Sequence, residues 1–327
     1  IYPNITLVNV PGNDEKRLDI VIAHEIGHNW LQAMIATNER DHAWMDEGMN
    51  SFYERKYRAL FYPPLNNPQK KIKTEISTEN FGELLLADQI KAKKDQPIET
   101  TSEDFTKSNY PSVVYIKGAL WMEKLEQTIG KEKMKELMQS YFNEWKMKHP
   151  YPEDFKKVAE TVSGQDLDSL FNLLHQKGNL NNRPPKKPIK STFLFPKLDG
   201  KAQYITIAPA IGYNEYDKLM IGAFVHNINL PTNPLKFALA PLYATGSKQF
   251  NFIGAASYDF YPSKNIYSIT PSLSIAKFNT AEGDGDQYQK LYRGFFKVVP
   301  SVKFEFAKST PTSNISKWIE WKSFFIS

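Results

Sequence analysis

The spacing of hydrophobic residues changes along this chain of 327 residues. In the first 180 residues, apolar positions recur every three or four residues, which is the period of one helix face. From about residue 197 onwards they alternate with small or polar residues, as in strands that have one apolar face. The pattern predicts an α+β chain with a mainly helical region, 1–180, and an antiparallel all-β region, 197–327.

The helical region is predicted to hold a series of amphipathic helices after one short strand at 5–10. The first helix starts after Asn13 or Asp14, either of which can cap its first turn. Its apolar residues Ile22, Ile26 and Ala33 are expected to face the core. Further helices are predicted at 44–61, 81–93, 115–129 and 131–147, from 152 to the glycine at 164, and at 167–174.

About seven long strands are predicted in the β region. A Pro/Lys-rich linker at 181–196, which cannot continue a helix, separates them from the helical region. The segment 281–289 is expected to be a polar loop. The predicted strands are 204–213, 218–228, 236–243, 250–260, 267–275, 296–306 and 315–325.

Two arrangements fit these strands. A soluble sheet or sandwich would bury the apolar face against a second layer. Part of an outer-membrane-type barrel would turn the apolar face to lipid, with aromatic residues near the strand ends. Strand length and the position of Tyr and Phe residues favour the partial barrel. This interpretation implies outer-membrane lipid as a partner and a place in the cell envelope, in the outer membrane or periplasm of a Gram-negative bacterium.

One stretch of the first predicted helix has the residues of a metal site. Residues 21–30 read V-I-A-H-E-I-G-H-N-W, so His24 and His28 lie one turn apart on one helix face, with Glu25 beside them. Glu47 follows nineteen residues after the second histidine. Two imidazoles and one carboxylate can hold a single Zn²⁺ and leave its fourth position open for water, as a catalytic zinc site requires.

Other residues near this motif are weaker candidates. Glu54 lies seven residues after Glu47 on the same face of the next predicted helix, where it can orient a ligand histidine. His42 has no spacing that favours ligation, and we expect a surface or loop histidine there. The chain has no cysteine, so a metal must be held by nitrogen and oxygen.

The two regions differ in charge. The formal charge is −4 over residues 1–180 and +9 over residues 181–327. The basic residues of the second region are spread among the strands, without the aromatic and basic clusters of a nucleic-acid site. We therefore expect no nucleic-acid partner.

Four segments occur in a fixed order in the helical region. They are H-E-I-G-H-N-W at 24–30, W-M-D-E-G-M-N-S-F-Y-E at 44–54, Y-P-S-V-V-Y-I-K-G at 110–118 and Y-P-E-D-F-K-K-V-A-E-T-V-S-G-Q-D-L at 151–167. Together they resemble the catalytic domain of the aminopeptidase N family of gluzincin zinc metallopeptidases. The resemblance covers residues 1 to about 178 and implies a thermolysin-like fold, one zinc ion, and a peptide or protein substrate.

The resemblance also implies residue roles. Glu25 would be the general base that takes a proton from the metal-activated water, and Tyr115 would donate a hydrogen bond to the oxyanion. Asp46 stands where the family usually has asparagine. Asp46 and Glu54 are expected to lie behind the zinc ligands and support them.

The sequence departs from the family at one point. A G-x-M-E-N segment, whose glutamate holds the free amino group of the substrate, does not occur between Ile1 and Asp19. We therefore expect a catalytic domain truncated at its N-terminus, with aminopeptidase specificity implied by resemblance. The alternative is a non-catalytic surface or membrane-anchored protein that keeps a vestigial zinc peptidase fold, against which the intact motif residues argue.

Overall fold

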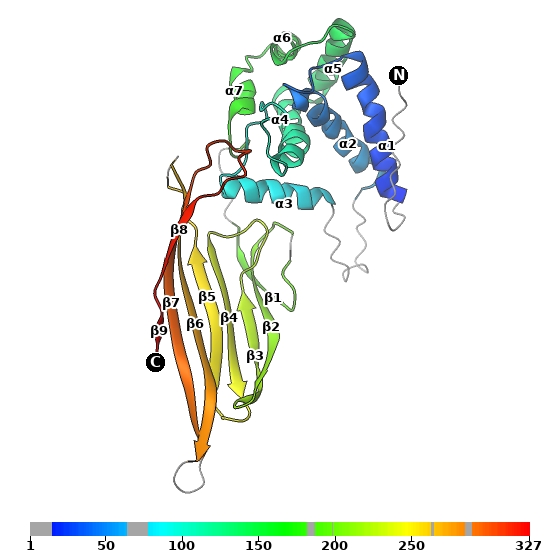
Figure 1. Cartoon of the computed structure of the whole chain (residues 1–327). Coiled ribbons are helices and arrows are strands. Elements are labelled where there is room, and N and C mark those ends of the chain that lie inside the picture. Colours follow the sequence, from blue (N-terminus) through cyan, green and yellow to red (C-terminus); the bar gives the residue numbers. More distant parts are fainter. Residues whose placement is uncertain (1–14, 64–77, 182–186, 198, 263–264, 285–289) are drawn as a thin grey trace. The chain divides into compact units, whose positions relative to one another are not determined.

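The computed structural model describes residues 15–63, 78–181, 187–197, 199–262, 265–284 and 290–327 (Figure 1). The predicted strand at 5–10 lies outside these residues. The chain divides into two compact units. Unit 1 is Ile1–Lys73 with Lys94–Asn182, and unit 2 is Thr74–Lys93 with Arg183–Ser327.

Unit 1 is helical throughout the part that the structure describes. Its core is aromatic, with Trp44, Trp121 and Phe155 fully buried and the rings of Trp44 and Trp121 5.1 Å apart. The predicted helix at 44–61 starts later, because residues 43–45 form a 3-10 turn. The elements are α1 (Glu15–His28), π-helix η1 (Asn29–Met34), η2 (Ala43–Met45), α2 (Glu47–Phe61), π-helix η4 (Tyr110–Lys117), α4 (Gly118–Ile129), α5 (Lys131–Trp145), α6 (Pro152–Ser163), α7 (Asp168–Phe171) and η5 (Asn172–His175).

The predicted core face of the first helix is wrong. Ile22 and Ile26 are about half exposed, and Ala33 is exposed as well. The buried apolar residues of this segment are Ile20, Leu31 and Ile35. The change from α- to π-helix at residue 29 shifts the side chains that follow it, which accounts for Ala33. Ile22 and Ile26 precede this change, and Ile26 lines an open pocket instead of the core.

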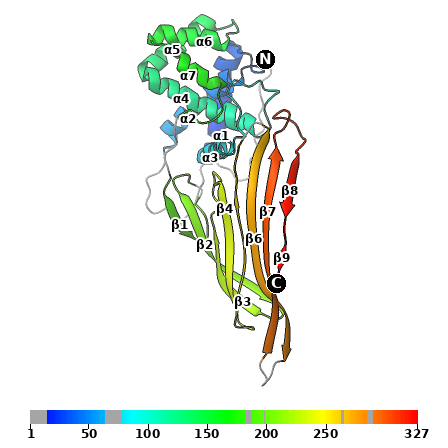
Figure 2. The same cartoon turned by 90° about the vertical axis from the view of Figure 1, so that its left-hand side faces the viewer.

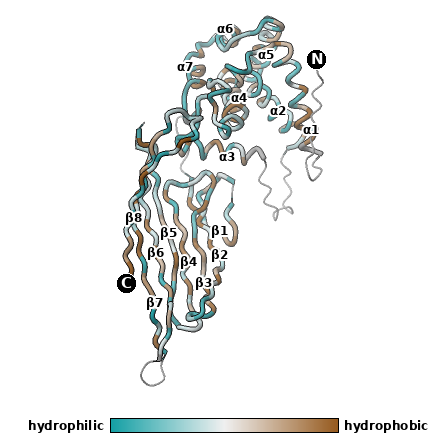
Figure 3. Tube along the Cα trace, in the orientation of Figure 1, coloured by the Kyte–Doolittle hydropathy of each residue, from teal (hydrophilic) through white to brown (hydrophobic). Residues whose placement is uncertain are grey.

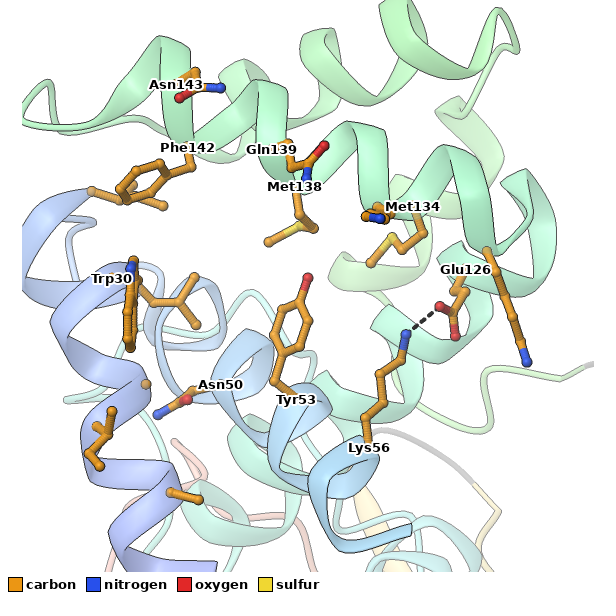
Figure 4. Close-up of a pocket in the computed structure, with 17 residues that line it drawn as sticks. Trp30, Asn50, Tyr53, Lys56, Glu126, Met134, Met138, Gln139, Phe142 and Asn143 are labelled. Atoms are coloured by element: carbon orange, nitrogen blue, oxygen red, sulfur yellow. Dashed lines mark hydrogen bonds and ion pairs between the residues drawn. The ribbon is translucent and has the colours of Figure 1, made fainter. Parts of the chain in front are cut away.

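An open pocket of about 820 Å³ lies beside this exposed face, between α1, η1, α2 and α5 (Figure 4). Trp30, Tyr53 and Phe142 are among its aromatic walls, and an ion pair between Lys56 and Glu126 crosses one end of it. Its α1 residues lie on a different side of the helix from His24 and His28.

Unit 2 is a nine-stranded mixed sheet with the strand order β1-β2-β3-β4-β5-β6-β7-β8, and β9 pairs with β7. All neighbours are antiparallel except β1 and β2, which are parallel. In the part that the structure describes, β1 and β8 do not pair with each other, so the sheet is open (Figure 2). The strands are β1 (Ile189–Phe193), β2 (Gln203–Asn214), β3 (Lys218–His226), β4 (Leu235–Ala244), β5 (Phe250–Tyr258), β6 (Ile266–Asp284), β7 (Lys290–Phe306), β8 (Trp318–Lys322) and β9 (Phe325–Ile326).

The structure differs from the strand predictions in three places. Strand β1 lies within the predicted linker, where parallel pairing with β2 overrides the poor local propensity. The β6–β7 hairpin continues to Asp284 and resumes at Lys290, so it takes up part of the predicted loop. The last predicted strand is two short strands, β8 and β9, that pair with β7.

Helix α3 (Thr78–Lys91) belongs to unit 2 and contacts the end of the sheet. The Asp88 carboxylate accepts a hydrogen bond from the Thr232 N–H at 2.6 Å, and the Lys91 ammonium donates to the Asn233 side chain at 3.0 Å. The helices of unit 1 and the sheet of unit 2 confirm the predicted α+β class, but the β region predicted to be antiparallel is a mixed sheet, because β1 and β2 are parallel. Among the described helices, none has the length and apolarity needed to cross a membrane.

Candidate metal centre

Helices α1 and α2 bring three predicted ligands to one point. His24 and His28 are one turn apart on α1, and Glu47 is the first residue of α2. Oxygen Oε2 of Glu47 lies 3.2 Å from Nε2 of His24 and 3.4 Å from Nε2 of His28. One ligand atom from each of the three side chains can be chosen so that all three atoms lie within 4.8 Å of one another.

A separate carboxylate holds the other ring nitrogen of each histidine. Nδ1 of His24 is 3.0 Å from the Glu54 carboxylate, and Nδ1 of His28 is 2.8 Å from the Asp46 carboxylate. These contacts turn both Nε2 atoms towards Glu47. An outer carboxylate that fixes the ring of a ligand histidine is a common feature of zinc sites.

The arrangement fits a zinc ion. Ligand atoms about 2.05 Å from a tetrahedral ion lie about 3.3 Å apart. Both distances from Glu47 Oε2 to the histidine nitrogens, 3.2 and 3.4 Å, agree with this separation. The donor set of two imidazoles and one carboxylate is also one that catalytic zinc uses, because it leaves a position for water.

Gly27 of α1 lies directly against the Asn50 side chain of α2. A Cβ atom at Gly27 would lie 1.9 Å from Oδ1 of Asn50, so any larger residue here requires the Asn50 side chain to move. The Asn50 amide then donates a hydrogen bond of 2.8 Å to the carbonyl oxygen of His24. Gly27 therefore allows α2 to approach the middle of the H-E-x-x-H motif, and Asn50 joins the two backbones there.

Tyr115 reaches the same cluster from π-helix η4. Its hydroxyl donates a hydrogen bond of 2.6 Å to Oε1 of Glu47, and its ring centroid is 6.0 Å from that of His24. Another close approach makes this possible, because a Cβ atom at Gly48 would lie only 3.2 Å from Cα of Gly118. The segment Y-P-S-V-V-Y-I-K-G thus lies against the first turn of α2.

Two other sequence candidates have different positions. Glu25 is half-buried on α1 next to His24, turned from it by about 100° around the helix axis. His42 is outside the cluster, and its Nδ1 is paired with the Glu99 carboxylate, which also accepts a hydrogen bond from the Trp44 indole. His42 is therefore a structural residue of the η2 region.

The close contacts in the cluster shift the pKa values of its histidines upwards and that of Glu47 downwards. Burial lowers the pKa of His24, but hydrogen bonds and charges of Glu47 and Glu54 outweigh this effect and raise the pKa to about 9. The hydrogen bond to Asp46 is the largest influence on His28 and raises its pKa to about 10. Burial raises the pKa of Glu47, yet hydrogen bonds from both histidines and Tyr115 together lower it to about 2.

Burial and the neighbouring Glu47 carboxylate raise the pKa of the Tyr115 hydroxyl well above its usual range. The hydroxyl therefore keeps its proton at neutral pH and can act as a hydrogen-bond donor.

Two supporting residues, Asn50 and Arg58, were not predicted. Asn50 packs against Gly27 and bonds to α1, and Arg58 forms an ion pair of 2.5 Å with Glu54, one turn earlier on α2. The spacing of Glu54 and Arg58, four residues apart, is the one sequence signal that could have indicated such a pair. The contact between Gly27 and Asn50 joins two helices, and no local pattern predicts it.

Comparisons with known proteins agree with this geometry. Residues 4–173 match the Peptidase family M1 domain. The chain is 26% identical over 161 residues to glutamyl aminopeptidase of Bitis rhinoceros, covering 49% of this chain and 16% of that protein.

Two further relatives show the same level of similarity. Leucine aminopeptidase 2 of Coccidioides immitis is 26% identical over 282 residues, covering 79% of this chain and 41% of that protein. Probable aminopeptidase 2 of Sulfurisphaera tokodaii is 26% identical over 156 residues, covering 47% and 19%. The chain thus spans less than half the length of these relatives. The family match takes in more than half of this chain, including both helices of the cluster, and the chain belongs to peptidase family M1.

Proposed function

We propose that the chain is a zinc-dependent peptidase that hydrolyses peptide bonds close to the N-terminus of its substrate. The observation that carries the proposal is the convergence of the two Nε2 atoms on one oxygen of Glu47. The expectation of an N-terminal substrate rests on the relatives, which are named aminopeptidases.

In this proposal His24, His28 and Glu47 hold the metal. When bound, zinc polarises the scissile carbonyl and lowers the pKa of a water molecule towards about 7. Glu25 takes a proton from that water and passes it to the leaving amine. Glu54 and Asp46 hold the two histidine rings, so that both Nε2 lone pairs stay directed at one point.

Tyr115 is the proposed donor to the oxyanion of the tetrahedral intermediate. Its hydroxyl keeps its proton and already points at the cluster, where Glu47 accepts its hydrogen bond. During the reaction this bond is transferred from the carboxylate oxygen to the substrate oxygen. A donor that is in place before charge develops stabilises the transition state, and removal of one such donor typically costs about 100- to 1,000-fold in kcat.

The test combines metal analysis with hydrolysis of aminoacyl amides and internally quenched peptides. We expect one zinc per chain, and we expect Glu25→Gln to keep the zinc while turnover falls to background. Glu132→Gln, an exposed change at the start of α5, is the matched control and should leave both unchanged.

Two outcomes would contradict the proposal. Full turnover by Glu25→Gln would remove this residue from the mechanism. Stoichiometric zinc without hydrolysis of any peptide tested would support the alternative, a non-catalytic protein with a vestigial peptidase fold.

A further inference from the structure

The two faces of the sheet in unit 2 differ in chemistry. The pairing of residues between neighbouring strands shows which side chains share a face, and one of the two faces is here called the outer face. It consists of the odd-numbered residues of 205–213, 219–225, 235–243, 269–277 and 319–321 and the even-numbered residues of 250–258 and 296–304. Lys277 is the one charged residue in this set, and the others are aliphatic, aromatic, proline or glycine. Figure 3 shows the resulting alternation of hydropathy along the strands.

At some neighbouring positions the polar residue is buried and the apolar residue is exposed, the reverse of what water favours. Thr206 is fully buried, whereas its apolar neighbour Ile207 on the outer face is 40% exposed. Asn251 is fully buried, whereas Phe250 is 68% exposed. Protein surfaces in water rarely expose a continuous apolar area that extends over seven strands. The outer face therefore needs an apolar environment.

Several polar groups of the opposite, inner face are hydrogen-bonded to one another. The hydroxyls of Ser272 and Ser301 are hydrogen-bonded to each other at 2.6 Å, and that of Thr270 donates to the Asp259 carboxylate at 3.0 Å. Lys303 and Glu305 of β7 also lie on this face. With the exception of Lys277, the charged side chains of these strand segments therefore lie on the inner face of the sheet.

The outer face has a fixed height and a layered composition. The row across its middle is aliphatic, with Ile207, Val225, Leu239, Gly254, Ile275 and Val298 paired in sequence from β2 to β7. Tyr243 and Phe250 pair near one end of the strands, and Tyr258 lies near the other.

The length of the strand between these aromatic positions suits a membrane. Strand β5, from Phe250 to Tyr258, has nine residues, and a tilted membrane-spanning strand has about nine to eleven. Such strands carry aromatic residues at both interfaces. A second protein layer would not require aromatic residues at both ends. Lys277 pairs with Phe252 near one end, where its ammonium can reach water.

We propose that the outer face of the unit 2 sheet contacts the hydrocarbon of a lipid bilayer, with the strands crossing it. In hydrocarbon the backbone groups along both edges of the sheet must also be paired. These edges include the outer sides of β1 and β8, residues 208–214 of β2 beyond the end of β1, and the part of β7 that neither β8 nor β9 covers.

The absence of cysteine allows a direct test with single-cysteine variants of the full chain. Leu273→Cys and Ser274→Cys are a matched pair, because they are adjacent and exposed in β6 but lie on opposite faces. Each variant carries an environment-sensitive fluorophore on the cysteine and is reconstituted with phosphatidylcholine and phosphatidylglycerol vesicles. Quenching is measured with acyl-chain-brominated lipid and, separately, with aqueous iodide.

The proposal predicts loss of fluorescence with brominated lipid at 273 but not at 274, and the reverse with iodide. The same difference is expected in β4, with quenching by brominated lipid at Leu239→Cys and by iodide at Ala240→Cys. Protection of position 273 from both quenchers would show that protein covers the outer face. Equal iodide quenching at 273 and 274, or failure of the chain to float with the vesicles, would also overturn the proposal.

Discussion

His24 and His28 each use one ring nitrogen for a supporting carboxylate and direct the other at Glu47. Removal of a support should therefore weaken metal binding without removing a ligand. We expect Glu54→Ala to lower zinc affinity by about 10- to 100-fold, because the His24 ring loses its fixed orientation. Competition with a fluorescent chelator measures the effect.

Glu126→Ala is the control for this change, since Glu126 pairs with Lys56 on the neighbouring pocket and is not part of the cluster. Equal zinc affinity in Glu54→Ala and Glu126→Ala would show that the hydrogen bond at Nδ1 of His24 has no influence on the metal.

The raised histidine pKa values predict that zinc binding releases protons. With pKa values of about 9 and 10, His24 and His28 are both protonated at pH 7.5 before zinc binds. Zinc requires the neutral imidazole, so about two protons must leave for each ion bound. Apparent affinity should therefore rise from pH 6 to pH 8.

Titration calorimetry at pH 7.5 in buffers of different ionisation enthalpy counts these protons. Observed heats that do not depend on the buffer would show that the histidines are neutral before zinc binds. The carboxylate of Glu47 contributes no proton in this range, because its pKa is about 2.

At the scale of elements, the position of α2 against α1 decides whether three ligands converge. Alanine in place of Gly27 would favour the helix by about 1 kcal/mol through propensity alone. The 1.9 Å approach to Asn50 Oδ1 instead forces the buried Asn50 side chain to move and to lose its hydrogen bond to the His24 carbonyl, and such overpacking typically costs about 1–3 kcal/mol. We expect Gly27→Ala to lower both stability in urea and zinc affinity.

Gly283→Ala is the matched change at a position with open space around it. It should leave zinc binding unchanged. A Gly27→Ala protein more stable than the parent would mean that α2 does not approach α1 as closely as the structure indicates.

Individual helices were predictable from the sequence where the spacing of their own residues determines them. The period of the apolar residues predicted α4 and α5, and Gly130 between them has the positive φ of 89° that ends a helix. The exposure of Ile22 and Ile26 was not predictable, because their partner surface is not encoded in the helix itself. Strand β1 was missed for a similar reason, since its pairing with β2 is a tertiary contact.

The candidate site was predictable in part. The H-E-x-x-H spacing and the distance to Glu47 indicated the proposed ligands, and the family resemblance of the Y-P-S-V-V-Y segment indicated Tyr115; the structure brings these side chains together. Asn50 escaped prediction because its contact with Gly27 depends on how two helices pack. Catalytic chemistry restricts residue types at fixed spacing, whereas the supporting contacts vary with the packing.

Across unit 1, a buried ion pair joins segments that are distant in sequence. The ammonium of Lys117, on the same π-helix as Tyr115, lies 3.3 Å from the Asp95 carboxylate and donates to the Gln176 carbonyl at 3.1 Å. The Asp95 carboxylate also accepts a hydrogen bond from the Gly178 N–H. Both charged side chains are almost completely buried.

Lys117→Met should destabilise unit 1 by about 3–5 kcal/mol, because it leaves the Asp95 carboxylate buried without its cation. The double variant Lys117→Met with Asp95→Asn should recover part of the loss, since the uncompensated charge is then gone. Urea unfolding followed by far-UV circular dichroism measures both. A loss in the double variant as large as in Lys117→Met would assign the effect to packing instead of charge.

The proposed peptidase activity depends on one metal ion bound between α1 and α2. Anomalous diffraction at the zinc edge, from crystals of the chain grown with zinc, tests it most directly. We predict a single strong peak at about 2.0–2.2 Å from Nε2 of His24, Nε2 of His28 and the carboxylate of Glu47. A peak elsewhere, or a Glu47 carboxylate turned away from both histidines in the zinc-bound crystal, would contradict the account.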